Sequence, residues 1–299
     1  MNTEAIKPMR LVRSSFLDRL RVIAACCFLF LTLISLIRVS HAQNVTSVES
    51  VASTPQEKQS GKSDIAEQLA NPLANMISVP FQWNYDRGRG VNQVGSDQTL
   101  LFQPVIPISL SGGDTLIVRP IVTSVWLNNV NGYTGAGLSN IQLEAFYAPN
   151  TNSSFIWGVG PYFSSPAGSS GQFGSQQMGA GATGVALNRV GGWTYGILAF
   201  QSWSLGGVAT SGTANNLYGQ PFIAYVTPDA WTYSLNFQSN YNYDTHRTSN
   251  PVNFDIAKLV YFDKTPIQFT VGPRYNVSSV PGGPQGWGAR AVITFVISK

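Results

Sequence analysis

Five charged side chains stand out because they occur within segments that otherwise alternate between apolar and polar residues. Each of them lies on the face opposite the apolar side chains of its own segment, since a strand directs successive side chains to opposite faces. Charges gathered on one shielded face can pair with one another, or they can line a passage and set which solutes it admits. These residues are Arg119, Glu144, Asp255, Arg274 and Arg290.

Uncharged amides occupy equivalent positions and extend this polar set. They are Gln82, Asn84, Gln142, Asn236 and Gln268. In one interpretation the charges pair with one another and with these amides, so that they simply fill the interior of the fold. In the other, the same residues line a narrow channel and determine its solute preference. Both interpretations place the polar set in the lumen of a closed sheet.

Signals for enzyme chemistry are weak. His246 is the one histidine after residue 42, so a metal site built from several histidines is not available. A membrane-embedded hydrolase would need a serine placed beside it by folding, and we interpret His246 as a solvated loop residue. Gly179, Gly181 and Gly184 match G-x-G-x-x-G, but neither the strand before nor the helix after that a dinucleotide site requires is present. We predict no enzyme activity and no cofactor.

The segment Trp231–Tyr243 shows what kind of sheet must position these side chains. Its odd positions are aromatic or apolar apart from Ser239, and its even positions are uncharged and polar. Trp and Tyr stand at both ends of the apolar face, with Leu235 and Phe237 near the middle. Aromatic rings with a polar edge favour the headgroup level of a membrane, whereas purely apolar groups favour the hydrocarbon. A tilted strand of this length rises roughly 25 Å, which matches the apolar band of an outer-membrane barrel.

The remaining segments repeat this alternation and predict an all-β fold, a transmembrane antiparallel up-and-down barrel of twelve strands preceded by a short helix within 63–76. The expected strands are 77–86, 99–110, 116–127, 138–148, 155–164, 180–189, 193–203, 217–226, 231–243, 252–260, 267–275 and 287–297.

The expected connections alternate in length, as they do in outer-membrane barrels with both termini in the periplasm. Tight turns follow every second strand, at 111–114, 149–154, 190–192, 227–230 and 261–266. Longer links rich in Gly, Ser and Asn lie between them, at 87–98, 128–137, 166–179, 205–216, 244–251 and 276–286.

The first 76 residues read as export and leader segments. Basic residues and then the apolar run 22–37 precede a small-residue site at Ser40–Ala42, which predicts a signal peptide over 1–42. A flexible leader with the short helix follows over 43–76, and the barrel occupies 77–299. Six of the eighteen basic residues lie before residue 43, so the remainder is neutral, with twelve basic and twelve acidic residues. Only 11% of residues are charged, and we predict no nucleic-acid partner.

The chain resembles the bacterial outer-membrane proteins grouped as MetA-pathway phenol-degradation-like, which are regarded as transporters. The resemblance runs from about residue 66 to the C-terminus and rests on the order and spacing of short motifs. It implies a barrel and a role in the passage of small, aromatic or hydrophobic molecules, with no functional residues to carry over. The motifs are Leu69–Asn75, Ile77–Tyr85, Gln103–Pro107, Ile156–Pro161, Gly192–Gly196, Gln220–Phe222 and Gly286–Gly288.

Taken together, the sequence predicts a barrel of the bacterial outer membrane, with membrane lipid outside and small-molecule solutes within. Passive passage or binding of such solutes is the expected function. A barrel that does not transport, and that binds partners or serves structure through its long extracellular loops, is the alternative.

Overall fold

The computed structural model describes residues 55–151, 153–167, 170–208 and 214–297 of the chain. The predicted signal peptide, 1–42, and residues 43–54 of the predicted leader lie outside these residues. One helix, α2 (Pro55–Leu69), and one short 3-10 turn, η1 (Ser111–Gly113), accompany fifteen strand segments. No helix in this part of the chain is long and apolar enough to cross a bilayer.

The strand segments are β1 (Ile77–Arg89), β2 (Gly95–Phe102), β3 (Ile106–Ser109), β4 (Thr115–Val130), β5 (Tyr133–Leu138), β6 (Ile141–Ala148), β7 (Phe155–Ser165), β8 (Gln176–Val190), β9 (Trp193–Val208), β10 (Asn216–Val226), β11 (Trp231–Phe237), β12 (Ser239–Asn242), β13 (Arg247–Phe262), β14 (Thr265–Ser278) and β15 (Gly286–Ile297).

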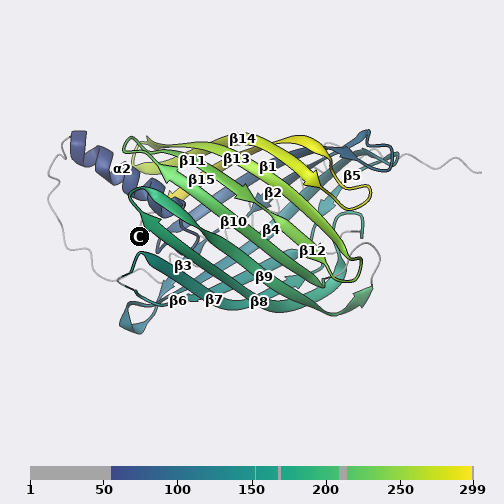
Figure 1. Ribbon diagram of the computed structural model, residues 1–299, viewed down its shortest axis with the longest axis horizontal. Helices are drawn as coiled ribbons and strands as arrows, with labels where there is room; N and C mark the ends of the chain where they lie inside the picture. Colours follow the sequence, from purple (N-terminus) through teal and green to yellow (C-terminus); the bar gives the residue numbers. More distant parts are fainter. Residues whose placement is uncertain (1–54, 152, 168–169, 209–213, 298–299) are drawn as a thin grey trace, which may run out of the picture.

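These segments form one closed ring of antiparallel strands (Figure 1). β2 continues as β3, β5 as β6 and β11 as β12, so fifteen segments make twelve strands. β15 pairs back onto β1, with Ile77 opposite Ile297, and this pairing closes the ring. The predicted twelve-stranded antiparallel barrel is therefore confirmed.

Side chains alternate across the wall as the sequence predicts. On β11 the odd residues Trp231, Tyr233 and Leu235 are exposed on the outer surface, whereas Thr232 and Asn236 are buried in the interior. Large exposed apolar residues recur on β6, β7, β9, β10 and β14 as well. Such an apolar outer surface is stable in lipid, because the bilayer shields these side chains from water.

Two facing prolines explain why β2 and β3 are separate segments. Phe102 pairs with Val122 and Ile106 with Val118, and the same register places Pro104 opposite Pro120. Neither proline has an N–H to donate, so the ladder is interrupted there. On its other side the strand stays attached to β1, since Val105 N donates to the carbonyl of Ser78 at 2.8 Å.

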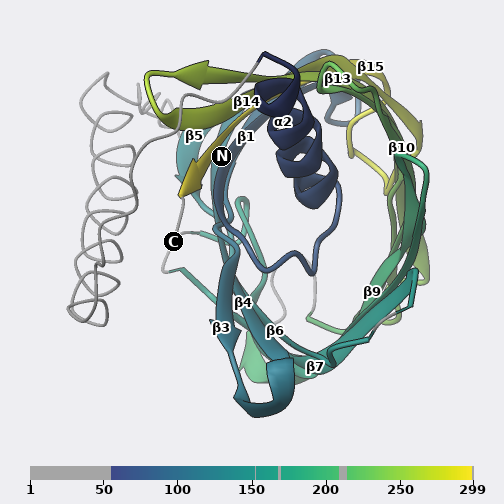
Figure 2. The same cartoon turned by 90° about the vertical axis from the view of Figure 1, so that its left-hand side faces the viewer.

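The helix lies in one mouth of the barrel (Figure 2). Ala66 is fully buried and packs with Val226, Ala230 and Leu259, which belong to the wall. Glu67 Oε2 accepts a hydrogen bond from Arg189 Nη2 at 2.8 Å, which ties the helix to the end of β8. These contacts place the helix in the barrel mouth.

The bounds of the helix differ from the prediction. It runs over 55–69 instead of starting near Ser63 and reaching toward Met76. Leu73, which falls within the predicted helical segment 63–76, lies beyond the end of the helix. It packs instead inside the wall, in a buried cluster with Ile117, Phe146 and Leu187. Pro72 is consistent with the early end, because a proline disfavours the helical conformation in the residue before it.

Several links that were predicted to be long are short, because the strands extend into them. Arg89 still pairs with Gly95, and Val130 pairs with Tyr133. The expected loop 128–137 is thus a hairpin that turns at Asn131 and Gly132, both with positive φ (52° and 80°). Asn-Gly favours such a tight turn because both residues tolerate the left-handed conformation. The predicted alternation in connection length is correspondingly less regular than expected.

Glycines on the lumen side of the wall allow neighbouring backbones to come close together. A Cβ on Gly160 in β7 would overlap the carbonyl oxygen of Ala145 in β6, whereas a Cβ on Gly219 in β10 would meet nothing within 4 Å. We expect Gly160→Ala to destabilise the barrel by about 1–3 kcal/mol, because the strand must shift to admit the methyl group. Urea unfolding in detergent measures this, with Gly219→Ala as the matched control. Equal midpoints for the two variants would contradict the explanation.

Candidate functional site

Two adjoining cavities occupy the interior of the barrel. The helix-side cavity, about 280 Å³, lies between the segment 68–76 and the wall, and its lining includes Asn236 and Gln268. The central cavity, about 350 Å³, is lined by residues from strands around the ring. Gln103, Arg119, Leu198 and Gln220 line both cavities, so these side chains form the boundary between them.

The structure places nine of the ten residues that the sequence singled out along these cavities. The tenth, Asp255, lies behind Arg290 and contacts its Nη1 through Oδ2 at 3.5 Å. Seven of the nine line the central cavity: Gln82, Asn84, Arg119, Gln142, Glu144, Arg274 and Arg290.

Arg119 holds the boundary between the cavities. Its Nη2 donates to Gln103 Oε1 at 2.7 Å and its Nη1 donates to Glu144 Oε2 at 3.2 Å. Arg119 and Glu144 face each other in register on β4 and β6. Gln103 lies in the break between β2 and β3, one residue before Pro104, where the chain leaves the ladder on the β4 side. The interrupted ladder and the arginine are therefore neighbours.

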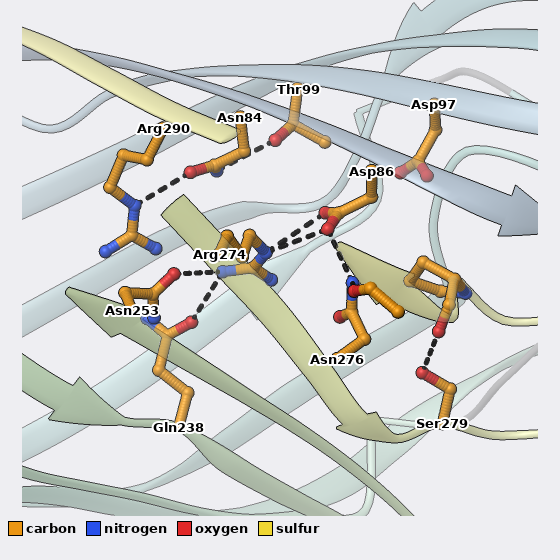
Figure 3. A network of polar contacts seen from close by, with 12 residues as sticks. Asn84, Asp86, Asp97, Thr99, Gln238, Asn253, Arg274, Asn276, Ser279 and Arg290 are labelled. Atoms are coloured by element: carbon orange, nitrogen blue, oxygen red, sulfur yellow. Dashed lines mark hydrogen bonds and ion pairs between the residues drawn. The ribbon is translucent and has the colours of Figure 1, made fainter. Parts of the chain in front are cut away.

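Arg274 connects four strands across the interior (Figure 3). Its Nε donates to both carboxylate oxygens of Asp86, at 3.0 and 3.1 Å, and its Nη1 donates to Asn253 at 2.9 Å and to Gln238 at 3.2 Å. Asn276 donates to the same carboxylate at 2.7 Å. Charge-assisted hydrogen bonds of this kind are the stronger ones, so Arg274 braces the lumen.

Arg290 forms a second group beside it. Its Nε donates to Asn84 Oδ1 at 2.9 Å, and Asn84 in turn donates to Thr99 at 3.1 Å. Its side chain is only 5% exposed. Its buried Nη2 has no hydrogen-bond partner among the described residues, and Arg290 is one of the residues that line the central cavity.

Three stacked aromatic rings complete the lumen and were not singled out in the sequence. Tyr162 stacks on Phe200 with a centroid distance of 4.2 Å, and Phe200 stacks on Tyr218 at 5.0 Å. Phe200 and Tyr218 line the central cavity. Tyr162 pairs in register with Gly181, which has no side chain on the strand between Tyr162 and Phe200. Gly181 is one of the three G-x-G-x-x-G glycines, and it lies within strand β8 as expected.

His246 lies in the turn between β12 and β13, where its Nδ1 and the Tyr241 hydroxyl are 3.0 Å apart. Its imidazole is thus paired with a tyrosine instead of a serine nucleophile. Within the described ranges no group of three His, Cys, Asp or Glu residues is arranged to hold a metal ion.

A closed antiparallel ring with an apolar outer surface and a charged, hydrogen-bonded interior defines a transmembrane β-barrel. The crystal structure of an outer-membrane channel from Pseudomonas putida F1 has the same fold. It aligns with a TM-score of 0.57 at 12% identity, over 75% of this chain and 97% of that chain. At this level of identity the likeness concerns the fold alone.

Two further structures align with lower scores. The KdgM porin in complex with oligogalacturonate gives a TM-score of 0.44 at 10% identity, over 74% of this chain and 99% of the porin. The outer-membrane phospholipase dimer of Salmonella typhi with bound calcium gives 0.45 at 12% identity, over 79% and 98%. We draw no argument from scores this low. No family model and no curated protein matches the chain, so the resemblance to the phenol-degradation-like group stays a prediction.

Proposed function

We propose that this chain is a barrel of the bacterial outer membrane that serves the passive passage or binding of small aromatic or hydrophobic solutes. The observation that supports this most directly is the pair of adjoining cavities. A barrel whose side chains merely filled its interior would not need two chambers that meet at a shared boundary of four side chains, Arg119 among them. The helix-side cavity leads from the mouth that holds α2, and the central cavity continues beyond Arg119.

The lining also fits a passage for small solutes. Polar side chains along it offer hydrogen bonds of modest strength, and Phe200, Tyr218 and Leu198 add apolar surface. Conduction requires binding that is favourable enough for entry and weak enough for exit. In this proposal the lumen-lining residues tune which solutes pass, and Arg119 sets the narrowest point.

Planar-bilayer recordings on the refolded protein test this proposal. We expect measurable conductance, and we expect Arg119→Ala/Glu144→Gln to raise it about twofold, because the boundary side chain is shortened while no carboxylate is left unpaired. Arg89→Gln/Asp97→Asn is the matched control, since these two residues pair with each other, line neither cavity and leave no unpaired carboxylate when replaced together.

Liposome swelling with benzyl alcohol and with glycerol tests whether the barrel passes aromatic solutes in addition to small polar ones. Faster entry of the aromatic solute than its rate through bare lipid supports passage of aromatic compounds. Absence of conductance in every variant would overturn passage and would favour the alternative, a barrel that acts through its outer loops.

A further inference from the structure

The central cavity combines two features that a simple water-filled pore does not need. One is an aromatic wall, in which Tyr162, Phe200 and Tyr218 form a continuous stack. Tyr162 is 3% exposed and closes one end of this stack. Phe200 and Tyr218 line the cavity, and since Phe200 is stacked between the two tyrosines, a further planar ring would extend the stack at Tyr218.

The other feature is a surplus of hydrogen-bond donors with positive charge at the cavity surface. Arg119, Arg274 and Arg290 line the cavity, and Glu144 is the one carboxylate among the lining residues. Asp86 and Asp255 balance the other charges from behind, through Arg274 and Arg290. The interior as a whole is therefore close to neutral, and it does not attract anions in general. The positive donors are local to the cavity.

Arg290 identifies where an anionic group would bind. Its Nε and Nη1 are engaged by Asn84 and Asp255, which fix the plane of the guanidinium. Its Nη2 is buried and has no partner among the described residues, and Arg290 is one of the residues that line the cavity. A buried donor that is left unsatisfied costs free energy, and an oxygen anion in the cavity would satisfy it with a charge-assisted hydrogen bond.

We propose that the central cavity is a binding site for small aromatic monocarboxylates. The ring of the ligand lies against Tyr218, and one carboxylate oxygen accepts from Arg290 Nη2. The cavity volume of about 350 Å³ lies within the range of small-molecule sites and suits one ring with one short acidic group. This inference rests on the proposed function and specifies the solute class.

Titration calorimetry on the refolded full-length barrel in detergent tests it with three probes. Benzoate carries both features, benzyl alcohol has the ring without the charge, and cyclohexanecarboxylate has the charge without the flat ring. We expect benzoate to bind at least tenfold more tightly than either of the others, because each lacks one of the two contacts. Equal affinities for benzoate and benzyl alcohol would overturn the proposal.

Two variants assign the contacts. Arg290→Lys keeps the charge but removes the free Nη2, and it should weaken benzoate about tenfold with little effect on benzyl alcohol. Tyr218→Leu removes a ring that takes part in no ion pair, so it should fold even if Arg290→Lys does not, and should erase the preference for benzoate over cyclohexanecarboxylate. Arg89→Gln/Asp97→Asn is the control and should bind benzoate as the unaltered chain does.

The outcomes separate this inference from the proposed function. Conductance without selective benzoate binding refutes the aromatic carboxylate site and leaves passage intact. Selective benzoate binding without conductance refutes passage and supports the site in a barrel that binds its ligand. Benzoate affinity unchanged in both Arg290→Lys and Tyr218→Leu would refute the assigned contacts.

Discussion

Ala66→Arg should raise the single-channel conductance several-fold, because it forces α2 out of the mouth of the barrel. Ala66 is fully buried in an apolar cluster with Val226, Ala230 and Leu259. Burying an unpaired charge costs several kcal/mol, far more than the few contacts of this short helix contribute. The helix should therefore undock, and the helix-side cavity should open.

Deletion of residues 55–69 should give the same conductance as Ala66→Arg, since both remove the helix from the mouth. Asp64→Ala is the matched control, because Asp64 lies on the exposed side of the same helix. Planar-bilayer recordings under identical salt compare the three. Conductance equal to that of the unaltered chain in both Ala66→Arg and the deletion would show that the helix does not limit passage.

Arg274→Ala should lower the free energy of unfolding by about 3–5 kcal/mol, because it leaves the buried carboxylate of Asp86 without its cation. Arg274 also donates to Gln238 and Asn253, so its loss releases bonds to three other strands. Urea unfolding of the refolded barrel in detergent, followed by tryptophan fluorescence, measures the change.

Arg274→Ala/Asp86→Asn provides the decisive comparison for this prediction. The second substitution removes the unpaired negative charge of Asp86, and we expect it to restore a large part of the lost stability. A double variant as unstable as the single one would mean that packing, and not charge, accounts for the effect. In recordings, Arg274→Ala should also change ion preference, since Arg274 lines the central cavity; unchanged preference would exclude it from selectivity.

The architecture could be predicted from the sequence because one rule applies throughout. Lipid outside and polar groups inside impose a period of two on every strand, as the face of Trp231, Tyr233 and Leu235 shows. Interruptions follow a different rule. The break at Gln103–Val105 depends on Pro104 facing Pro120, which only the register between β2 and β4 reveals.

The interior was less accessible to sequence reasoning. Alternation assigns charged residues to the lumen, but it does not say that Arg274 meets Asp86, which lies 188 residues away. Such pairings depend on the closure of the ring and on the tilt of the strands. The aromatic stack was missed for the opposite reason, because aromatic residues were assigned to the lipid side. The sequence did contain one indication that Phe200 faces the lumen, because it lies on the same face of its strand as Thr194 and Leu198.

The pairing of Ile77 with Ile297 has a consequence for biogenesis. Until β15 meets β1, a growing polypeptide would carry two open edges, each with a row of unpaired donors and acceptors able to join another copy. The pairing of β1 with β15 removes both edges. It joins the two strands that lie farthest apart in the chain, so its closure has the largest entropic cost. An unfinished ring would therefore depend on shielding by escort proteins during export, and completion of the seam would be the step that commits the polypeptide to the bilayer.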